Sequence, residues 1–387
     1  MNIIENTQDL KNFCEMLGRQ EFITVDLEFL REKTYYAKLC LIQVGSMEDC
    51  AIIDPLAPEM DLSPFFAILQ NPNIVKVFHS GRQDIEILYK LSGNIPNPVF
   101  DTQIAAMVCG FGESVSYETL VNKIVNISLD KTCRLSNWSK RPLDKKQLQY
   151  ALSDVTHLVP IYKHLKKELE NTGRLHWLDE ETEILANPET YIVHPMDAWQ
   201  KIKHRSHNAR FLTILRELAA WREERAQRKD TPRQTIIKDE CLLNIAAACP
   251  RTLEEMEEIR NIRKDILSGK LATEILEVIS HAKEIPSSQY VRPEKEKNIS
   301  GASLSLYELL KLLLKIRSQE SGVVAKLIAS EEDLRKLSVF ADKNNPVLKG
   351  WRLELFGKEA CALREGKLTI SYNPDKKEID IKTAVSD

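Results

Sequence analysis

The sequence has no hydrophobic run that approaches about 18 residues, the length that a membrane-spanning helix requires. Its first residues, "MNIIENTQDLKNF", contain no basic segment followed by an apolar one, so a secretory signal peptide is not expected. The eight cysteines are scattered and none forms a CxxC pair, which favours reduced thiols. These absences predict a cytoplasmic protein that is not bound to a membrane.

The 387 residues are an ordinary globular mixture, 43% hydrophobic and 29% charged, and the length suggests two or three domains. The net charge of −3 conceals an asymmetry between the two halves. Residues 1–195 carry 19 Lys+Arg and 27 Asp+Glu, whereas the remainder carries 35 and 30. An acidic half joined to a basic half fits a metal-using domain joined to one that binds a polyanion. The alternative is that the charged residues simply lie on solvated helix faces, which would produce a similar difference in charge between the two halves.

Strands and helices are mixed over the first 195 residues. The segment "ITVDLEFL", residues 23–30, alternates apolar and polar side chains with a period of two, which predicts a strand with one buried face. Further strands are expected at 38–45, 50–54 and 74–79, the first three strands as an antiparallel meander, with helices at 7–18, 61–70, 82–91, 101–109, 116–125 and 145–171. We therefore predict a mixed α/β sheet with helices on its faces.

From about residue 207 the pattern is helical. Asp239 is expected to be the N-cap of a helix that stops at Pro250, and Thr252 with Glu255 has the pattern of a capping box. The polar segment 284–303 reads as a linker. Beyond it the sequence predicts helices at 304–317, 320–329 and 331–341 and a short hairpin, "KLTISYNPDKKEIDI". Two similar helical groups on either side of a linker suggest a repeated small domain.

Carboxylates occur at four places where the predicted elements could bring them together. Asp26 and Glu28 lie on the first strand, Asp84 lies at the start of a helix, and Asp101 is the third place. The fourth is Asp154, which has Tyr150 one helical turn before it. Each has an ordinary explanation as a solvated strand edge, a helix cap or a helix face. Hard divalent cations take oxygen ligands, however, and a pair of Mg²⁺ ions needs several converging carboxylates. The set predicts a two-metal site that Asp26 is suited to bridge.

This ordered set resembles the ribonuclease D family, within the DEDD superfamily of 3′–5′ exonucleases. The segments "VDLEFL", "VFHSGRQDIEIL" with "FDTQIAA", and "QYALSDV" are similar to the three exonuclease motifs. The segment "TPRQTIIKDECLLNIAAACP" resembles an HRDC domain (helicase and RNase D C-terminal), and "GWRLELFG" resembles part of a second one. The resemblance implies a ribonuclease H-like catalytic domain at 1–195, an HRDC domain at 207–286 and a second HRDC-like domain at 303–387, the last two small and all-helical.

The resemblance also implies which residues act. Four acids match the family's metal ligands, and Tyr150 matches the tyrosine that defines the DEDDy branch; the four are Asp26, Glu28, Asp84 and Asp154. Two divalent ions are implied, Mg²⁺ or else Mn²⁺, and Tyr150 would orient the attacking water. Asp101 is expected to cap a helix or to support the ligands instead of binding metal.

The implied enzyme is a 3′–5′ exoribonuclease that hydrolyses 3′-terminal nucleotides from structured RNA, notably tRNA precursors, and releases nucleoside 5′-monophosphates. We expect a monomer. Two alternatives stay open. One is a DNA 3′–5′ exonuclease of the same superfamily, and the other is a catalytically silent RNA-binding protein on the same fold. A catalytically silent protein would normally lack at least one of the four metal-binding acids, and all four are present in this sequence.

Six residues outside the acid set are candidates for contact with nucleic acid. Phe29 could stack on the terminal base, or it could lie on the buried face of its strand. His79 could contact the substrate, or it could be a structural hydrogen-bonding residue. Residues 199–233 hold ten Lys+Arg against four Asp+Glu, which predicts a surface that follows phosphates. A solvated helix face is the alternative for that cluster, whose candidates are Lys201, Lys203, Arg222 and Arg225.

Overall fold

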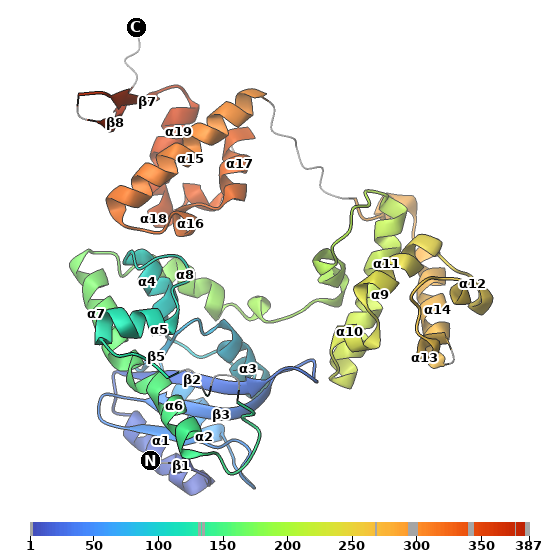
Figure 1. Ribbon diagram of the computed structural model, residues 1–387, viewed down its shortest axis with the longest axis horizontal. Coiled ribbons are helices and arrows are strands. Elements are labelled where there is room, and N and C mark those ends of the chain that lie inside the picture. The colour runs from blue at the N-terminus through green and yellow to red at the C-terminus, as the bar shows by residue number, and fades with distance from the viewer. Residues whose placement is uncertain are drawn as a thin grey trace. The chain divides into compact units, whose positions relative to one another are not determined.

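The computed structural model describes residues 3–130, 133, 136–267, 269–292, 301–339, 344–375 and 377–383. The chain forms two compact units (Figure 1). The first unit comprises Met1–Leu27, Leu41–Asn187 and Lys297–Asp387, and the second comprises Glu28–Cys40 and Pro188–Glu296. Each unit is thus assembled from separated segments, whereas the domain ranges read from the sequence are continuous and stay predictions. No helix among the described residues is long and apolar enough to cross a membrane.

Most of a six-stranded mixed sheet lies in the first unit. The strands, in the order in which they pair, are β1 (Ile3–Ile4), β4 (Cys50–Ile53), β3 (Lys38–Gly45), β2 (Phe22–Leu30), β5 (Val75–Phe78) and β6 (Val99–Asp101). The end of β2 and the start of β3 belong to the segment Glu28–Cys40 of the second unit. β3 and β4 are antiparallel, whereas β1 with β4, β2 with β5, and β5 with β6 are parallel. The predicted mixed sheet is confirmed. β1 and β6 were not predicted, because two or three residues are too few to show an alternating pattern.

The first half of β2 is covered on both faces. Ile23 and Thr24 are each 0% exposed although their side chains point to opposite sides of the strand. The prediction of a single buried face is therefore wrong for this half. The reason lies in a helix on the second face, α6 (Lys145–Thr156): the hydroxyl of Thr24 donates to the carbonyl of Val155 at 2.9 Å. From Asp26 onward this face is partly exposed.

Eight α-helices accompany the sheet in the described part of residues 3–187. They are α1 (Thr7–Leu17), α2 (Ser63–Leu69), α3 (Arg82–Ser92), α4 (Thr102–Val108), α5 (Tyr117–Leu120), α6, α7 (Leu158–Asn171) and α8 (Trp177–Ala186). The helix expected over 145–171 is interrupted at His157. Pro160 has no N–H for the carbonyl four residues earlier, and its ring crowds that carbonyl. α8 has no counterpart among the predicted helices.

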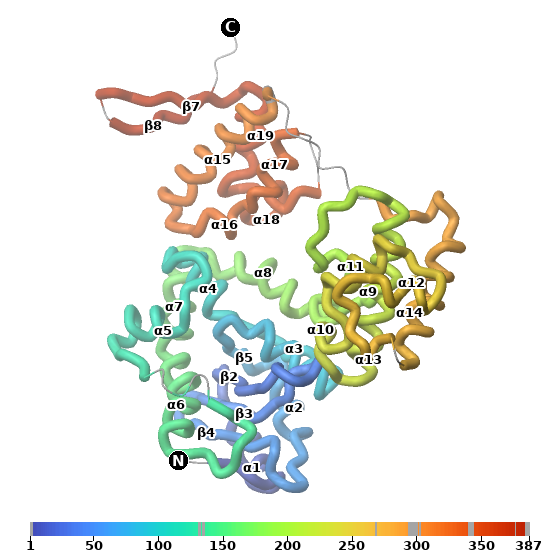
Figure 2. Tube along the Cα trace, turned by 45° about the vertical axis from the view of Figure 1, so that its right-hand side comes forward, coloured from blue at the N-terminus to red at the C-terminus, as the bar shows by residue number. Residues whose placement is uncertain are grey.

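The first unit ends in a helical group with its own core. Its helices are α15 (Gly301–Ser321), α16 (Ala325–Ile328), α17 (Glu331–Val339), α18 (Gly350–Arg352) and α19 (Lys358–Arg364). Leu310, Leu313, Leu337 and Phe356 are completely buried in this core. A hairpin follows α19, formed by β7 (Leu368–Asn373) and β8 (Glu378–Thr383), which are antiparallel as predicted (Figure 2).

This helical group packs on α8 and α4 within the first unit. Trp177 of α8 stacks on Trp351, with 4.5 Å between ring centroids and 7° between ring planes. The guanidinium of Arg352 donates to Glu181 and, at 3.3 Å, to Glu180. Glu181 is only 9% exposed, so its charge is compensated chiefly by Arg352. An aromatic stack with a partly buried ion pair fixes the helical group to the sheet-bearing part of the unit.

The second unit is helical. It consists of a 3₁₀ segment, η3 (Pro195–Lys201), followed by α9 (Ala209–Lys229), α10 (Arg233–Ile236), α11 (Asp239–Ala248), α12 (Leu253–Glu257), α13 (Lys264–Leu267) and α14 (Lys270–Glu284). The buried face of α9 packs against α11 and α14, and Leu215, Leu218, Leu242 and Ile275 are completely buried. Tyr35, from the loop after β2, belongs to this core.

Two helix caps in this unit differ from the predictions. The N-cap of α11 is Lys238, so the prediction of Asp239 is wrong by one residue. The carboxylate of Asp239 is engaged by Arg222 at 2.7 Å, which removes it from a capping role. Thr252 does cap α12 and accepts from the amide of Glu255 at 3.3 Å. The Glu255 carboxylate accepts from Arg251, not from Thr252, so the capping box forms only in part.

Candidate active site

Two carboxylates leave the same side of β2. Asp26 and Glu28 are two residues apart, so their side chains point to the same side of the strand as that of Thr24. Both are partly exposed, whereas Thr24 is buried. The hydrogen bond from Thr24 to Val155 fixes α6 against this side of the strand. The strand therefore presents two acids beside the helix that carries the third.

A close approach between α6 and the sheet depends on Gly45 at the end of β3. A Cβ atom there would lie 2.6 Å from the Thr24 hydroxyl and 3.2 Å from the Val155 carbonyl. Any larger residue would push α6 away from the strand. The start of α6 is fixed by a capping box, in which Asp144 accepts from the amide of Gln147 at 2.8 Å and Gln147 accepts from the amide of Asp144 at 3.1 Å.

Asp26, Glu28 and Asp154 form a carboxylate cluster. One oxygen of each lies within 4.8 Å of the others, close enough for all three to bind a single cation. Burial raises the pKa of Asp26 to about 7. Burial, and then the charge of Asp26, raise the pKa of Asp154 to about 8, against a hydrogen bond from Tyr150 that lowers it. Such raised pKa values mean that the charges are poorly compensated by the protein itself.

Asp84 lies at the first turn of α3 and is 8% exposed. It is not part of the three-carboxylate cluster. Burial raises its pKa well above the usual 3.8, and the charges of Asp26 and Asp101 add to the effect. The charge of Asp26 thus raises the pKa of both Asp154 and Asp84.

Asp101 holds the start of α3 and the start of α4. Its carboxylate accepts from the amides of Gln103 at 2.8 Å, Ser80 at 3.1 Å and Gly81 at 2.8 Å. The expectation that Asp101 caps a helix is confirmed, since it is the N-cap of α4. By fixing Ser80 and Gly81 it also fixes the turn that leads to Asp84.

Tyr150 and Asp154 lie one turn apart on α6, and the Tyr150 hydroxyl hydrogen-bonds the Asp154 carboxylate. The Tyr150 ring packs near Trp138, with 6.1 Å between ring centroids. A second tyrosine, Tyr117, was missed by the sequence reasoning. Its hydroxyl donates to the carbonyl of Ser153 at 2.9 Å, and the charges of Asp154 and Asp26 help burial to raise its pKa. No sequence motif marks Tyr117, whereas Thr24 could have been found because it is in phase with Asp26.

The candidates near the acids have different surroundings. The His79 ring contacts the hydroxyl of Thr102 at 3.0 Å, and it donates to the carbonyl of Val115. These contacts favour the structural role for His79 over substrate contact. Phe29 is partly exposed and does not belong to the buried core. Its stacking on a base stays a prediction.

Two of the four basic candidates are buried. Arg222 is 2% exposed and pairs with Asp239, and Arg225 is 9% exposed and pairs with Glu274 at 2.5 Å. Neither can belong to an exposed surface that follows phosphates, which corrects the prediction for both. At helical spacing both continue the apolar stripe of Leu215 and Leu218, and this face of α9 packs against α11 and α14. Lys201 and Lys203 are exposed, and their prediction stands untested.

Comparison with known proteins gives the family. Residues 1–170 match the family described as 3′–5′ exonuclease, and residues 211–279 match the HRDC domain. Ribonuclease D of Granulibacter bethesdensis is 42% identical over 382 residues, 98% of this chain and 96% of that protein. Ribonuclease D of Gluconacetobacter diazotrophicus is 41% identical over 371 residues, 96% of this chain and 94% of that protein. The chain belongs to the ribonuclease D family.

Solved structures agree with this assignment. The crystal structure of Escherichia coli RNase D matches with a TM-score of 0.82 at 30% identity and covers 95% of this chain and 99% of that one. A protein from Bifidobacterium adolescentis, 20% identical, shares the fold with a TM-score of 0.72. The predicted fold class and the enzyme class, a ribonuclease D-type 3′–5′ exoribonuclease, are confirmed. DEDD-type exonucleases use divalent metal ions, and an all-carboxylate cluster suits such ions.

Proposed function

We propose that the protein shortens structured RNA from its 3′ end, notably tRNA precursors, with two divalent ions, Mg²⁺ in the first instance, and releases nucleoside 5′-monophosphates. The observation that carries the proposal is the cluster of Asp26, Glu28 and Asp154, with oxygens within 4.8 Å of one another. The E. coli relative is described as an exoribonuclease involved in structured RNA processing, which supports RNA as the substrate.

The proposed roles follow from the surroundings of each acid. Asp26, Glu28 and Asp154 would hold one ion, and Asp26 with Asp84 would hold the other. The influence of Asp26 on the pKa values of both Asp84 and Asp154 supports a shared position between the two sites. Bound ions would supply Lewis-acid activation of water and would neutralise charge at the scissile phosphate.

Tyr150 is the proposed positioning group for the attacking water. Its hydroxyl is held beside Asp154, and its ring is backed by Trp138, so it has little freedom to move. A fixed hydroxyl can align a water with the scissile P–O bond in the transition state. Tyr117 would keep α6 in place through the Ser153 carbonyl, which supports both Tyr150 and Asp154.

The experiment is a time course on a 3′-extended tRNA precursor, with Mg²⁺ and with chelator. Wild-type protein should shorten the RNA from its 3′ end in Mg²⁺ and release nucleoside 5′-monophosphates, and it should be inactive in chelator. Asp26→Asn should lose activity on the order of 10³-fold or more. Glu15→Gln, which removes an exposed carboxylate of α1, is the matched control.

Matched RNA and DNA oligomers separate the alternatives. Faster digestion of the RNA oligomer supports the proposal, whereas a preference for DNA would favour the DNA exonuclease. Tight RNA binding without shortening in Mg²⁺ or Mn²⁺ would indicate a silent RNA-binding protein. Equal rates for wild type and Asp26→Asn would refute the metal assignment.

A further inference from the structure

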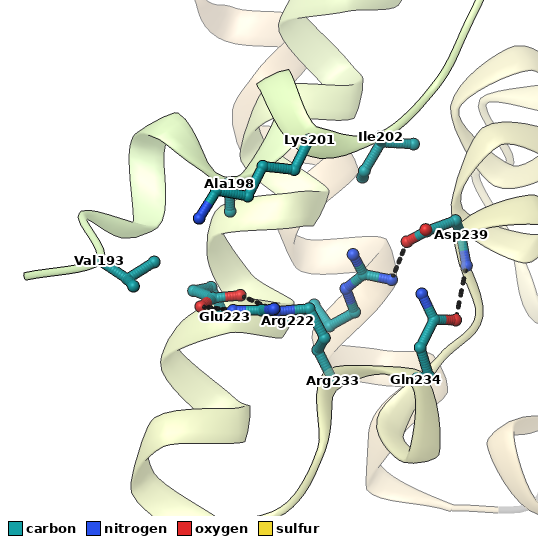
Figure 3. Close-up of a pocket in the computed structure, with 9 residues that line it drawn as sticks. All are labelled: Val193, Ala198, Lys201, Ile202, Arg222, Glu223, Arg233, Gln234 and Asp239. Carbon is teal, nitrogen blue, oxygen red and sulfur yellow. Dashed lines mark hydrogen bonds and ion pairs between the residues drawn. The ribbon is translucent and has the colours of Figure 1, made fainter. Parts of the chain in front are cut away.

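The second unit contains a small pocket between η3 and the helices α9, α10 and α11 (Figure 3). Its volume is about 140 Å³. Whole drug-sized ligands need roughly 300 Å³ or more, so this pocket suits a single chemical group. Lys201 and Ile202 lie on one side of it, Arg222, Glu223 and Arg233 on the opposite side, and Asp239 at one end (Figure 3).

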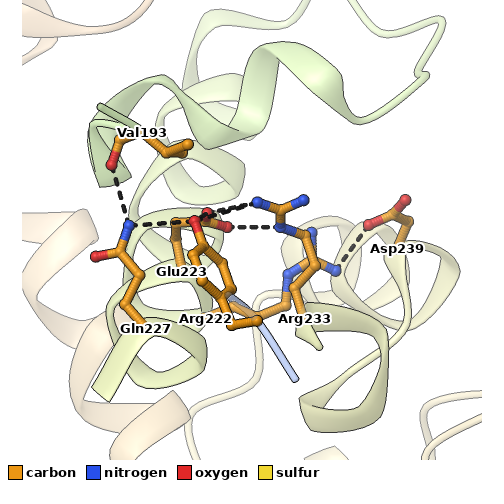
Figure 4. Close-up of polar contacts among 7 residues, drawn as sticks. Val193, Arg222, Glu223, Gln227, Arg233 and Asp239 are labelled. Carbon is orange, nitrogen blue, oxygen red and sulfur yellow. Dashed lines mark hydrogen bonds and ion pairs between the residues drawn. The ribbon is translucent and has the colours of Figure 1, made fainter. Parts of the chain in front are cut away.

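Glu223 has its hydrogen-bonding capacity taken up by neighbours. It accepts from Nε of Arg233 at 2.8 Å and from Nη2 at 2.6 Å, and it also accepts from the Tyr35 hydroxyl (Figure 4). Gln227 completes the group by donating to the Tyr35 hydroxyl at 3.3 Å and to the Val193 carbonyl at 3.1 Å. The charges of Glu223 and Arg233 therefore compensate each other.

The positive charge and the hydrogen-bond donors of Arg222 are less well compensated than those of Arg233. It is 2% exposed, and its Nη1 donates to the carbonyl of Ile237 at 2.9 Å and to Asp239 at 2.7 Å. Its Nε is buried and has no hydrogen-bond partner among the described residues. Burial lowers the pKa of Arg222 despite Asp239, whose side chain is 40% exposed and so shares its charge with water. A buried donor without a partner costs stability and invites an acceptor.

The charges that line the pocket sum in favour of an anion. Lys201, Arg222 and Arg233 are cationic, and Glu223 and Asp239 are anionic. Lys201 is exposed at the mouth, whereas Arg222 is buried inside. An ordered water would accept a hydrogen bond from the Nε of Arg222, but it would not compensate the surplus positive charge of the pocket. An oxyanion would do both if the Lys201 side chain, whose amine points towards the Val193 side in Figure 3, turns towards the Arg222 guanidinium.

We propose that this pocket binds a phosphate group between Arg222 and Lys201. The phosphate could belong to an RNA backbone or be free inorganic phosphate, and the RNA source rests on the proposed function. In either case the contact is made by one inserted phosphate and not by an exposed surface. This reconciles the burial of Arg222 with a role in phosphate binding.

The first experiment titrates inorganic phosphate into the full-length protein by calorimetry, at constant ionic strength and with chelator present. Chelator removes divalent ions, so the outcome is independent of the nuclease site and of the proposed function. Lys201→Gln should weaken phosphate binding about fivefold to tenfold, because it removes one charged hydrogen bond. Gln234→Glu, which adds a carboxylate at the pocket, should weaken binding as well. Lys264→Gln, an exposed cation of α13 outside the pocket, should leave binding unchanged.

The second experiment identifies the source of the phosphate. An RNA oligomer is bound to the Asp26→Asn protein at fixed Mg²⁺, and the effect of Lys201→Gln is compared with that of Lys264→Gln. Weaker RNA binding for Lys201→Gln alone assigns the pocket to an RNA phosphate. Unchanged RNA binding together with weakened phosphate binding assigns it to free phosphate. No binding of phosphate by the wild type, or equal weakening by Lys201→Gln and Lys264→Gln, would overturn the proposal and leave a water-filled pocket.

Discussion

Replacing Asp26 by asparagine should make the metal-free protein more stable while it abolishes activity. The pKa of Asp26 is raised from 3.8 to about 7 because burial removes water from around its carboxyl group. The folded chain therefore holds this proton more tightly than the unfolded chain. A difference of that size corresponds to about 4 kcal/mol, which sets the scale of the stabilisation expected from Asp26→Asn.

The sign of the pH dependence follows from the raised pKa. Below about pH 4 the carboxyl of Asp26 is protonated in both the folded and the unfolded chain, so it does not lower the stability of the wild type. As the pH rises from about 4 to about 7, the unfolded chain loses the proton while the folded chain keeps it, so wild-type stability falls relative to Asp26→Asn. Above about pH 7 the difference is constant. The stability gap should therefore widen between pH 5 and pH 8.

Thermal melts in chelator at pH 5, 6, 7 and 8 measure the gap. At pH 8 Asp26→Asn should melt higher than wild type by several degrees, on the order of 8–16 °C if each kcal/mol shifts the midpoint by about 2–4 °C. Mg²⁺ should raise the wild-type midpoint most at high pH and should have little effect on Asp26→Asn. Glu15→Gln should melt like wild type at every pH. A gap that is absent, or that is the same at pH 5 and pH 8, would refute the reasoning.

Three further changes test the supports of the site. Tyr150→Phe should lower kcat by roughly 10–10³-fold with little change in KM, since the hydroxyl matters chiefly in the transition state; equal kcat would reduce Tyr150 to a packing residue. Asp101→Asn should raise the Mg²⁺ concentration needed for half-maximal activity, because it loses an acceptor for the amides before Asp84; an unchanged Mg²⁺ dependence would contradict this. Arg352→Met should lower the free energy of unfolding by about 3 kcal/mol, measured by heat or urea, because it leaves Glu181 buried without its partner. Lys326→Met, which removes an exposed ion pair with Glu113, should leave the free energy of unfolding almost unchanged.

The sequence predicts the parts of the site that depend on local pattern. Period-two alternation placed Asp26 and Glu28 on one side of a strand, and the structure brings both to Asp154. The spacing of Tyr150 and Asp154 placed them on one helix face, and they do hydrogen-bond. The extra strands and the break before Pro160 were not foreseen, because the strands are short and the break depends on a single residue; α8, with ten residues, was missed without such a reason.

What the sequence could not supply were contacts between distant segments. Helical spacing places Arg222 and Arg225 in line with Leu215 and Leu218, but it does not show that Asp239 and Glu274 would pair with them on that buried face. The same limitation hid Gly45, whose lack of a side chain matters only because Thr24 and Val155 meet it from other elements. Burial of a polar residue is decided by its tertiary neighbours, and these do not appear in a single sequence.

The contacts that Trp351 and Arg352 make with α8 have a consequence for the stage of synthesis at which each part can complete its packing. Glu181 leaves the ribosome 171 residues before its partner Arg352, a delay of roughly 10–30 s at about 5–20 residues per second. Tyr35 precedes its partner Glu223 by 188 residues. During synthesis α8 and the loop after β2 are thus exposed without the partners that later bury them. The growing chain therefore carries an unfinished exonuclease, and its last supporting contacts form long after the acids themselves have been made.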